Sequence, residues 1–431
     1  MKGTHLTGTA CFCALCCLSV LSTAPAIALP VGSDSIIHSV SGRELIQRGQ
    51  YEKGLEQLSQ AYALFPLNVT LKQNLAEGYA AYGHQFFKQK KYEQAGENFV
   101  KALELYPDNT TYTLLHGICC YNLKRYDVAR YELQRARELS PDSVEVLYFL
   151  GLVQYDTDNR AEAVELWEQA LKLAPERKEI SALLAKARKE IAVEAGMDRG
   201  HSSRFNLTYD PDVDSTFALA LLDVLESAAN LVGAELGLFP AARVPVAIYT
   251  RADYKTVTDS PDWSGGFYDG TIRLPFGAVK EVTPALRGVL YHEYAHVIVF
   301  ELTRGNCPLW LNEGIAEMFG RMQYNQPLMA LKRAARSGKY ADFRKLEGGF
   351  GAFSSSEAGL AYQQSYSLVN YMVTSYGWHR VKQILGDLGQ GMTFDAAVSL
   401  ALKDYNLNYN RLVLEWSVSL AREAEKAEGN H

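Results

Sequence analysis

The sequence has no excess of positive charge. It contains 43 lysine and arginine residues against 49 aspartate and glutamate residues, and its formal net charge is −6 over 431 residues. Proteins that bind nucleic acid concentrate lysine and arginine in a patch or stripe, and neither such a patch nor a long run of like charge occurs here. We therefore expect no nucleic-acid partner. The length fits two or three domains of about 150 residues each.

Cysteine is scarce outside the first 28 residues. Of the seven cysteines, only Cys119, Cys120 and Cys307 lie beyond that stretch. An odd number of cysteines does not form a disulfide framework, and their spacing does not match a cysteine zinc site. Cys119 and Cys120 are neighbours in an apolar helical stretch, so we interpret them as core residues.

Long apolar runs are missing too, apart from the stretch from Ala10 to Leu21, which is shorter than the roughly 20 residues of a membrane span. Lys2 precedes it, and "APAIALP" follows with Ala26 and Ala28 in a small-residue cleavage pattern. Residues 1–28 are therefore predicted to be an export signal, the alternative being an uncleaved anchor. We expect a periplasmic or extracellular protein, either free or loosely attached to a membrane surface.

The first half of the chain repeats itself. Four similar segments begin "QYEKGLEQ", "KYEQAGEN", "RYDVARYE" and "NRAEAVEL", and each ends near a proline: Pro66, Pro107, Pro141 and Pro175. The prolines are 41, 34 and 34 residues apart. A period of 34 residues is typical of tetratricopeptide repeats, each a pair of antiparallel helices. The longer first interval predicts an insertion of about two helical turns near "AAYGHQFFKQ".

The amphipathic pattern explains why the repeats must stack. Apolar residues of "AEAVELWEQALKLAP" share one helical face, and a single hairpin cannot cover that face. We predict an α-solenoid over about 36–196, within a repeat domain of 36–200, with the charged helix 178–196 as its cap. The resemblance to the tetratricopeptide family implies a protein partner bound in the repeat groove. The alternative is a scaffold that orients the second half.

The second half mixes helices and strands. The Gly- and Pro-containing stretch "GMDRGHSSRFNLTYDPDVD" is predicted to be a linker. Helix 215–237, strand 244–250 and a strand–turn–strand over 265–275 follow. Next comes a helix in which Thr283 is the N-cap and Pro284 lies in the first turn. The pattern predicts an α+β domain, which we place at 204–425.

The motif "HEYAH" lies within that last helix. Four residues of helix bring His296 to within about 40° of His292 around the axis, so both imidazoles can reach one Zn²⁺. Glu293 would lie beside them, within reach of a water molecule. The alternative is a core helix whose three polar groups find other partners. A catalytic zinc site needs a third protein ligand, and "WLNEGIAEMF" supplies Glu313 and, one turn later, Glu317.

Residues 285–320 resemble the peptidase MA-like gluzincins, and the wider region 204–425 fits them too. The resemblance implies a zincin fold and zinc-dependent hydrolysis of peptide bonds, with His292, His296 and Glu313 as ligands. It also implies that Glu317 orients a ligand histidine, for which we choose His292. The chain lacks the G-x-M-E-N segment of the related aminopeptidases, which argues against an aminopeptidase of that type.

The expected mechanism uses Glu293 as the base that takes a proton from the attacking water and passes it to the leaving amine. Related gluzincins supply a tyrosine as a second oxyanion donor. We choose Tyr366 first and Tyr362 second. The two lie one helical turn apart, so both can face the same cleft. "DGTIRLP" could border the cleft and bind substrate as an added strand, with Gly270, Thr271 and Ile272 as the nearest candidates. The "GGFGAF" stretch (348–353) is interpreted as a loop near the cleft.

The sequence thus supports an exported zinc metallopeptidase whose repeats recruit a protein partner or substrate. Two alternatives stay open. The repeats could carry the function of a binding protein, with a weakly active or inactive zincin module. The chain could also be a chaperone or assembly factor that zinc stabilises.

Overall fold

The computed structural model describes residues 33–258, 267–276, 279–348, 350 and 353–429. The predicted signal at 1–28 lies outside these residues, and so does part of the predicted loop 348–353. The described chain forms two compact units, one ending at Ile191 and the other beginning at Ala192. We refer to them as the repeat unit and the second unit.

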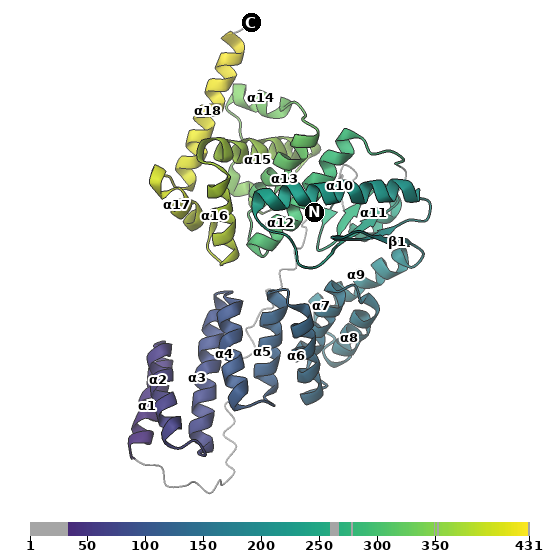
Figure 1. Ribbon diagram of the computed structural model, residues 1–431. Coiled ribbons are helices and arrows are strands. Elements are labelled where there is room, and N and C mark those ends of the chain that lie inside the picture. Colours follow the sequence, from purple (N-terminus) through teal and green to yellow (C-terminus); the bar gives the residue numbers. More distant parts are fainter. Residues whose placement is uncertain (1–32, 259–266, 277–278, 349, 351–352, 430–431) are drawn as a thin grey trace. The chain divides into compact units, whose positions relative to one another are not determined.

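The repeat unit consists of helices packed as successive hairpins (Figure 1). The helices are α1 (Ser33–Gln47), α2 (Tyr51–Leu64), α3 (Val69–Lys88), α4 (Tyr92–Leu105), α5 (Thr110–Asn122), α6 (Tyr126–Leu139), α7 (Val144–Asp156), α8 (Arg160–Leu173) and α9 (Lys178–Glu194). The predicted insertion is confirmed, because α3 has 20 residues whereas α5 and α7 have 13 each.

The turns between repeats share one capping device. The side chains of Asn68, Asn109 and Ser143 each accept a hydrogen bond from the backbone N–H three residues later, at the start of α3, α5 and α7. Such caps satisfy a donor that the helix itself leaves unpaired. The preceding proline and the cap together end one hairpin and begin the next.

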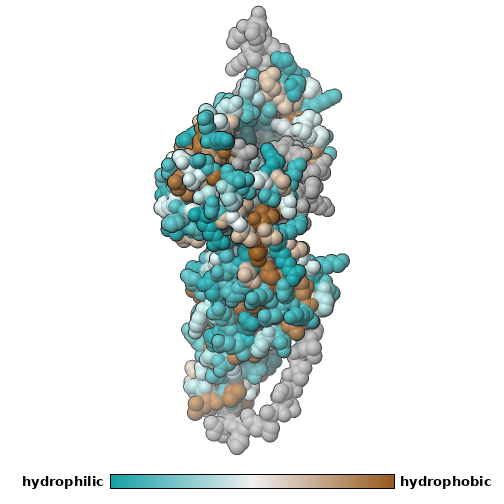
Figure 2. All heavy atoms as spheres, turned by 90° about the vertical axis from the view of Figure 1, so that its right-hand side faces the viewer, coloured by the Kyte–Doolittle hydropathy of each residue, from teal (hydrophilic) through white to brown (hydrophobic). Residues whose placement is uncertain are grey.

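The first helix of the array buries small and polar residues and leaves apolar residues exposed. Its buried residues are Ser35, Ser39 and Gly42, whereas Ile37 is 63% exposed. Leu67, in the turn before α3, is 85% exposed. Figure 2 shows a mostly hydrophilic surface on which brown, apolar residues gather at the lower end of the repeat unit. A terminal repeat of a soluble solenoid ordinarily presents a polar outer face, so this end is atypical.

The second unit contains a five-stranded sheet in the order β1-β2-β3-β5-β4. The strands are β1 (Asp198–His201), β2 (Phe205–Tyr209), β3 (Val244–Ile248), β4 (Phe267–Tyr268) and β5 (Ile272–Leu274). Strands β2, β3 and β5 are parallel, and β1 and β4 are antiparallel to their neighbours. The predicted strands at 244–250 and 265–275 are confirmed.

The predicted linker before this sheet is wrong. It contains β1 and β2, and the boundaries that we placed at residues 200 and 204 both fall within this hairpin. The alternation in "FNLTY", where Phe205 and Leu207 are buried and Asn206 is exposed, is the strand signal. The flanking Gly, Ser, Asp and Pro residues obscured it.

Helices pack around this sheet. They are α10 (Ser215–Leu236), α11 (Arg251–Thr258), α12 (Pro284–Thr303), α13 (Leu309–Gln323), α14 (Met329–Ser337), α15 (Ser355–Tyr376), α16 (Trp378–Gly389), α17 (Phe394–Ala401) and α18 (Tyr409–Gly429), with 3-10 turns η1 (Phe343–Leu346) and η2 (Lys403–Tyr405). By length and composition α10 could cross a membrane, but 56% of its apolar window is buried within the protein, as in a soluble core helix. Helix α12 packs against α10, α13 and α16.

Candidate metal centre

The motif helix α12 begins as the sequence predicts. Thr283 caps it by accepting a hydrogen bond from Leu286 N at 3.2 Å, and Pro284 occupies the first turn. Glycines let α12 and α13 approach closely: a Cβ on Gly288 would lie 3.0 Å from the carbonyl oxygen of Gly320, and a Cβ on Gly320 would lie equally near that of Gly288. This backbone contact, one turn before His292, places α13 beside the motif.

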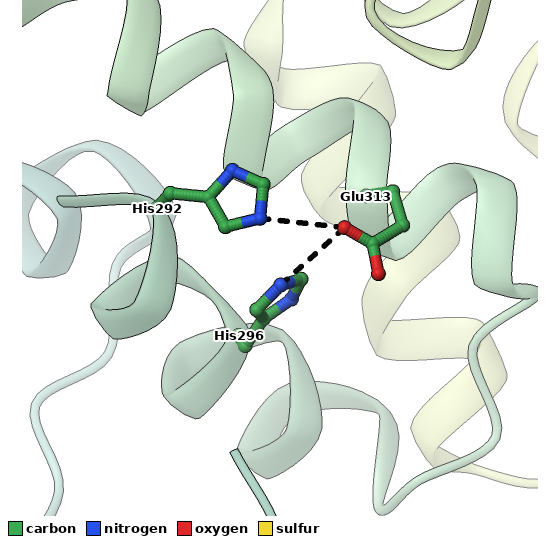
Figure 3. A group of neighbouring side chains, drawn as sticks. All are labelled: His292, His296 and Glu313. Atoms are coloured by element: carbon green, nitrogen blue, oxygen red, sulfur yellow. Dashed lines mark ion pairs between the residues drawn. The ribbon is translucent and has the colours of Figure 1, made fainter. Parts of the chain in front are cut away.

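The predicted ligands meet at one point. The Nε2 atoms of His292 and His296 lie 3.3 and 3.5 Å from the same Oε2 atom of Glu313 (Figure 3). One ligand atom from each of the three side chains lies within 4.8 Å of the other two. Ligand atoms held about 2.0–2.1 Å from a tetrahedral metal would be separated by about 3.4 Å. The two separations between histidine and glutamate match this value, and the three side chains are close enough to share one metal ion.

The far side of each imidazole is also held. His292 Nδ1 lies 3.4 Å from Glu317 Oε1, as the resemblance implies. His296 Nδ1 lies 2.9 Å from Asn312 Oδ1. An oxygen acceptor at Nδ1 fixes the tautomer in which Nε2 presents its lone pair to a metal. Sequence reasoning missed Asn312, although its place directly before Glu313 and the need of each ligand histidine for an Nδ1 partner could have identified it.

Two buried carboxylate oxygens support the assignment of a cation site. Oε2 of Glu293 accepts no hydrogen bond from the described residues, and Oε2 of Glu313 has only the two imidazoles as ion-pair partners. A buried carboxylate oxygen that accepts no hydrogen bond carries a desolvation cost that a cation or a bound water would offset. The donor set of two imidazoles and one carboxylate is the set that zinc uses in hydrolases. These residues fit a divalent metal such as Zn²⁺.

Burial and neighbouring charges shift the pKa of His292 and of Glu313. Burial favours neutral imidazoles, but the contacts with Glu313 and Glu317 outweigh it and raise the pKa of His292 well above its usual value. Burial would raise the pKa of Glu313, but His296 and His292 lower it instead. This attraction holds the three side chains close together.

Glu293 has the environment of a general base. Its side chain is 5% exposed, and burial raises its pKa above the usual value even though His296 and His292 oppose the shift. A carboxylate whose pKa is raised toward neutrality accepts a proton more readily and returns it as an acid. Its carboxylate interacts electrostatically with His296, His292 and Glu313, so it lies close to these three side chains.

Of the two tyrosines considered as oxyanion donors, Tyr362 lies nearer to the metal ligands. Its ring centroid is 6.5 Å from that of His292, and burial together with Glu313, Glu293 and Glu317 raises its pKa, so the phenol stays protonated. Tyr366, the first choice from sequence, instead lies under the Arg321 guanidinium at 4.7 Å. The structure favours Tyr362, which α15 directs toward the ligands, over Tyr366.

Arg321 connects Tyr366 to the metal centre indirectly. Its Nε donates to Glu317 Oε2 at 2.7 Å. Glu317 in turn faces His292. Tyr366 is therefore connected to the candidate ligand His292 only through Arg321 and Glu317.

The predicted binding of substrate to the strand at Gly270, Thr271 and Ile272 is wrong. Strand β5 is paired on both sides, with β3 and with β4, so Ile272 has no free backbone edge. Thr271 is 7% exposed and Ile272 is fully buried. Gly270, with φ +107°, turns the chain so that β4 takes the outer position. Among the described strands the edge on this side of the sheet is β4.

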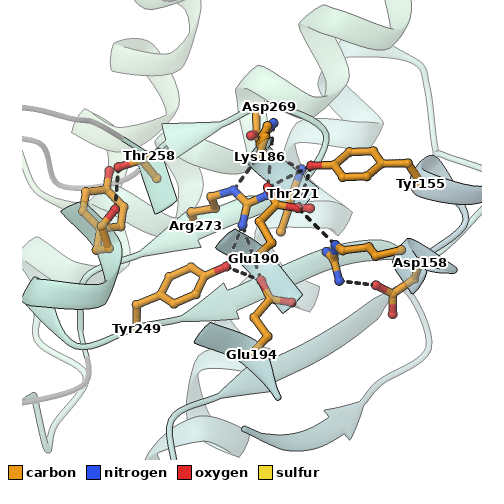
Figure 4. Close-up of polar contacts among 12 residues, drawn as sticks. Tyr155, Asp158, Lys186, Glu190, Glu194, Tyr249, Thr258, Asp269, Thr271 and Arg273 are labelled. Carbon is orange, nitrogen blue, oxygen red and sulfur yellow. Dashed lines mark hydrogen bonds and ion pairs between the residues drawn. The ribbon is translucent and has the colours of Figure 1, made fainter. Parts of the chain in front are cut away.

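A buried ion network holds the side chain of Arg273 on β5. Arg273, 1% exposed, donates from Nε to Asp269 at 3.1 Å and from a terminal nitrogen to the Tyr249 hydroxyl at 2.6 Å (Figure 4). Tyr249 donates to Glu194, which also lies 3.5 Å from Arg273. A buried arginine needs such partners to offset the loss of hydration. Strand β5 and the contacts of Arg273 are therefore part of the buried core of the second unit.

Family models match both units. The Peptidase MA superfamily model matches residues 229–421, and two tetratricopeptide-repeat models match 81–144 and 123–187. The chain combines tetratricopeptide repeats with a peptidase MA-like domain. The candidate ligands His292, His296 and Glu313, together with Glu293, lie within the matched part of that domain. The predicted solenoid followed by an α+β zincin-like domain is confirmed.

Solved structures show local similarity to this chain. They include the first tetratricopeptide domain of Spaghetti (RPAP3) bound to the HSP90 peptide SRMEEVD, with 24% identity, 27% of this chain and 93% of that chain covered, and a TM-score of 0.27. MamA from Desulfovibrio magneticus RS-1 is 20% identical, with 37% of this chain and 86% of that chain covered and a TM-score of 0.31. The Arabidopsis OM64 tetratricopeptide domain is 21% identical, with 28% of this chain and 99% of that chain covered and a TM-score of 0.27. Comparison with curated proteins found no match.

Proposed function

We propose that this protein is an exported zinc metallopeptidase that hydrolyses peptide bonds and whose repeats recruit a protein partner or substrate. One observation carries the proposal: two imidazoles of an H-E-x-x-H helix and the Glu313 carboxylate converge on one point with Glu293 beside it. The match to the Peptidase MA superfamily supports a peptidase, and the tetratricopeptide repeats support a protein or peptide partner.

The metal would be held by His292, His296 and Glu313. A bound Zn²⁺ would supply Lewis acidity, which lowers the pKa of water and polarises a carbonyl group. Glu293 would take the proton from the attacking water and deliver it to the leaving amine nitrogen. Tyr362 would donate a hydrogen bond to the oxygen on which negative charge develops. Glu317 and Asn312 would keep both ligand imidazoles in the required tautomer.

The surroundings of the site suggest how a substrate would be placed. The edge strand β4 would accept an extended peptide as an added strand, since β5 is paired on both sides. The N-terminal signal pattern supports export, and we propose a periplasmic or extracellular location, either free or at a membrane surface.

Metal analysis combined with a protease assay tests the proposal. Purified protein should contain about one zinc ion per chain. It should cleave casein or members of a peptide library, and a chelator should stop the cleavage. Glu293→Gln should keep the metal and lose about 10²–10⁴-fold in kcat, because only the proton transfer is removed.

Other results of these assays would count against the proposal. Equal cleavage by wild type and Glu293→Gln would contradict the mechanism. Bound zinc without cleavage by either protein would favour the binding or chaperone alternatives.

A further inference from the structure

Two hollows lie on either side of helix α4 in the repeat unit. One, of about 470 Å³, lies between α2 and α4 with α3 at its floor, and the other, of about 350 Å³, lies between α4 and α5. Both include Glu97 and Lys101 of α4 in their lining. Their volumes fall within the range of about 300–1,000 Å³ that ligand sites occupy.

The same acidic pair recurs in the two repeats that build these hollows. Glu52 and Glu56 lie one turn apart on α2, and Glu93 and Glu97 occupy the equivalent positions one repeat later, at the interval of 41 residues that separates Pro66 from Pro107. All four carboxylates line a hollow and are exposed. Because the repeats stack side by side, the acidic pairs form a row across neighbouring helices.

Most of the negative charge of the larger hollow is not neutralised within the protein, because Glu52, Glu56 and Glu97 share it with one cation, Lys101. The smaller hollow also contains Lys101, Arg125 and His116, which balance its glutamates. Glu93 is paired with Arg125 through two contacts of 3.1 and 2.8 Å. Glu56, Glu97 and Glu104, which also lines a hollow, have no ion-pair partner among the described residues. Like charges left unpaired on one surface repel each other and attract a cationic partner.

Aromatic rings form the floor of the larger hollow. Tyr79, Tyr82 and Phe86 line it, and the rings of Tyr82 and Phe86 are 4.5 Å apart. The chain already places one ammonium group on this floor, since Lys101 Nζ lies 5.6 Å from the centre of the Tyr79 ring. Lysine and arginine side chains pack their alkyl stems on apolar surface and their charges against ring faces.

We propose that the larger hollow beside α4 binds a peptide segment rich in lysine or arginine. A basic side chain would enter the larger hollow, with its charged end at Glu56 and Glu97 and its stem over the aromatic floor. The proposal rests on the recruiting role proposed for the repeats and adds the chemistry of the recruited segment. Charge complementarity selects this occupant over an acidic peptide, which the unpaired carboxylates would repel.

Binding of labelled peptides to the full-length protein tests the proposal. The probe is a short fluorescein-labelled peptide in which lysine alternates with leucine, and the matched probe has glutamate in place of lysine. All arms carry Glu293→Gln, so hydrolysis cannot remove the probe. Fluorescence anisotropy should show binding of the lysine probe that weakens as salt rises and no binding of the glutamate probe.

Charge-reversal variants locate the site. Glu56→Lys combined with Glu97→Lys should weaken binding of the lysine probe about tenfold or more, because two attractions become repulsions. Glu165→Lys is the control, since Glu165 is exposed on α8 and occupies the repeat position of Glu97 two repeats later. Circular dichroism establishes that each variant is folded. The control should bind as the unmodified protein does.

The outcomes separate this proposal from the peptidase assignment. Failure of the lysine probe to bind, equal binding of both probes, or equal loss in Glu165→Lys and in the double variant would overturn the docking surface. Zinc content and casein cleavage of the wild-type protein are measured independently. They would stand even if the peptide did not bind.

Discussion

The two units contain similar side-chain arrangements with different consequences. In the repeat unit, His116 and Cys120 lie four residues apart on α5, with Glu132 from the next helix. In the second unit, His292 and His296 lie four apart on α12, with Glu313 from the next helix. Both sets offer metal-binding side chain types at helical spacing.

The direction of the ring nitrogens distinguishes them. Cys120 Sγ contacts Nε2 of His116 at 3.5 Å, and Glu132 lies at the opposite nitrogen, 3.4 Å from Nδ1. Glu132 also lies 3.5 Å from Arg135. In the second unit, both Nε2 atoms face one carboxylate oxygen, and oxygen acceptors hold both Nδ1 atoms. Convergence of lone pairs, rather than residue spacing, makes a metal centre.

The largest difference between the two sets should follow from removing one histidine from each. His296→Gln deletes a ligand, so zinc affinity should fall by more than the roughly 10–100-fold that follows loss of an outer partner, and cleavage should stop. His116→Gln should leave zinc content and cleavage unchanged. Metal analysis and a casein assay measure both. Zinc lost equally from the two variants would refute the distinction.

Replacing Tyr362 and Tyr366 one at a time should show which of them is the oxyanion donor of the second unit. Tyr362→Phe removes the proposed oxyanion donor, so kcat should fall about 10²–10³-fold while zinc is retained. Tyr366→Phe keeps the ring beneath Arg321 and should change kcat far less. Steady-state kinetics of the two variants decide between them. A larger loss in Tyr366→Phe would restore the choice made from sequence.

Asn312→Ala should have a smaller effect on the metal centre. The variant removes the acceptor at Nδ1 of His296, so zinc affinity should fall about 10–100-fold. Asn312→Asp keeps an acceptor and should recover most of that affinity. Competition with a zinc chelator measures the dissociation constants. An unchanged affinity in Asn312→Ala would show that this hydrogen bond does not orient the ligand.

The smallest expected effect is a dependence of thermal stability on pH that arises from His116 in the repeat unit. Burial opposes protonation of His116, but its contacts with Cys120 and Glu132 raise its pKa to about 9, above the roughly 6.5 of an unfolded chain. A raised folded pKa adds stability that is complete below pH about 6.5 and disappears as pH rises through about 9. Zinc-loaded protein should therefore lose thermal stability over that interval.

His116→Gln supplies the control for this pH effect. The variant lacks the titrating group, so its melting temperature should depend less on pH over the same interval than that of the wild type. Differential scanning fluorimetry across this range compares the two proteins. Identical pH profiles would show that His116 does not titrate as described.

The sequence predicted most of what depends on local pattern, with the strand β2 (Phe205–Tyr209) as the exception. Repeat period, the caps at Thr283 and Pro284 and the spacing of His292 and His296 follow from helix geometry, and each appears in the structure. Glu313 was identified through a family resemblance. Its meeting with the histidines depends on the close approach of α12 and α13 at Gly288 and Gly320.

The errors arose where tertiary packing decides. The placement of β4 outside β5 depends on pairing across the sheet, which the local pattern of "DGTIRLP" does not specify. Tyr362 and Tyr366 are one turn apart on α15, so only the orientation of that helix distinguishes them. The hollows beside α4 likewise require neighbouring repeats to be stacked before they exist.

X-ray absorption spectroscopy at the zinc edge tests the central claim most directly. Zinc-loaded protein should show two imidazole nitrogens and one or two oxygens at about 2.0–2.1 Å, from His292, His296, Glu313 and solvent. Mutation of His292 or His296 should remove one imidazole contribution. A sulfur shell at about 2.3 Å, or a spectrum unchanged by both mutations, would contradict the assignment of the metal to these residues.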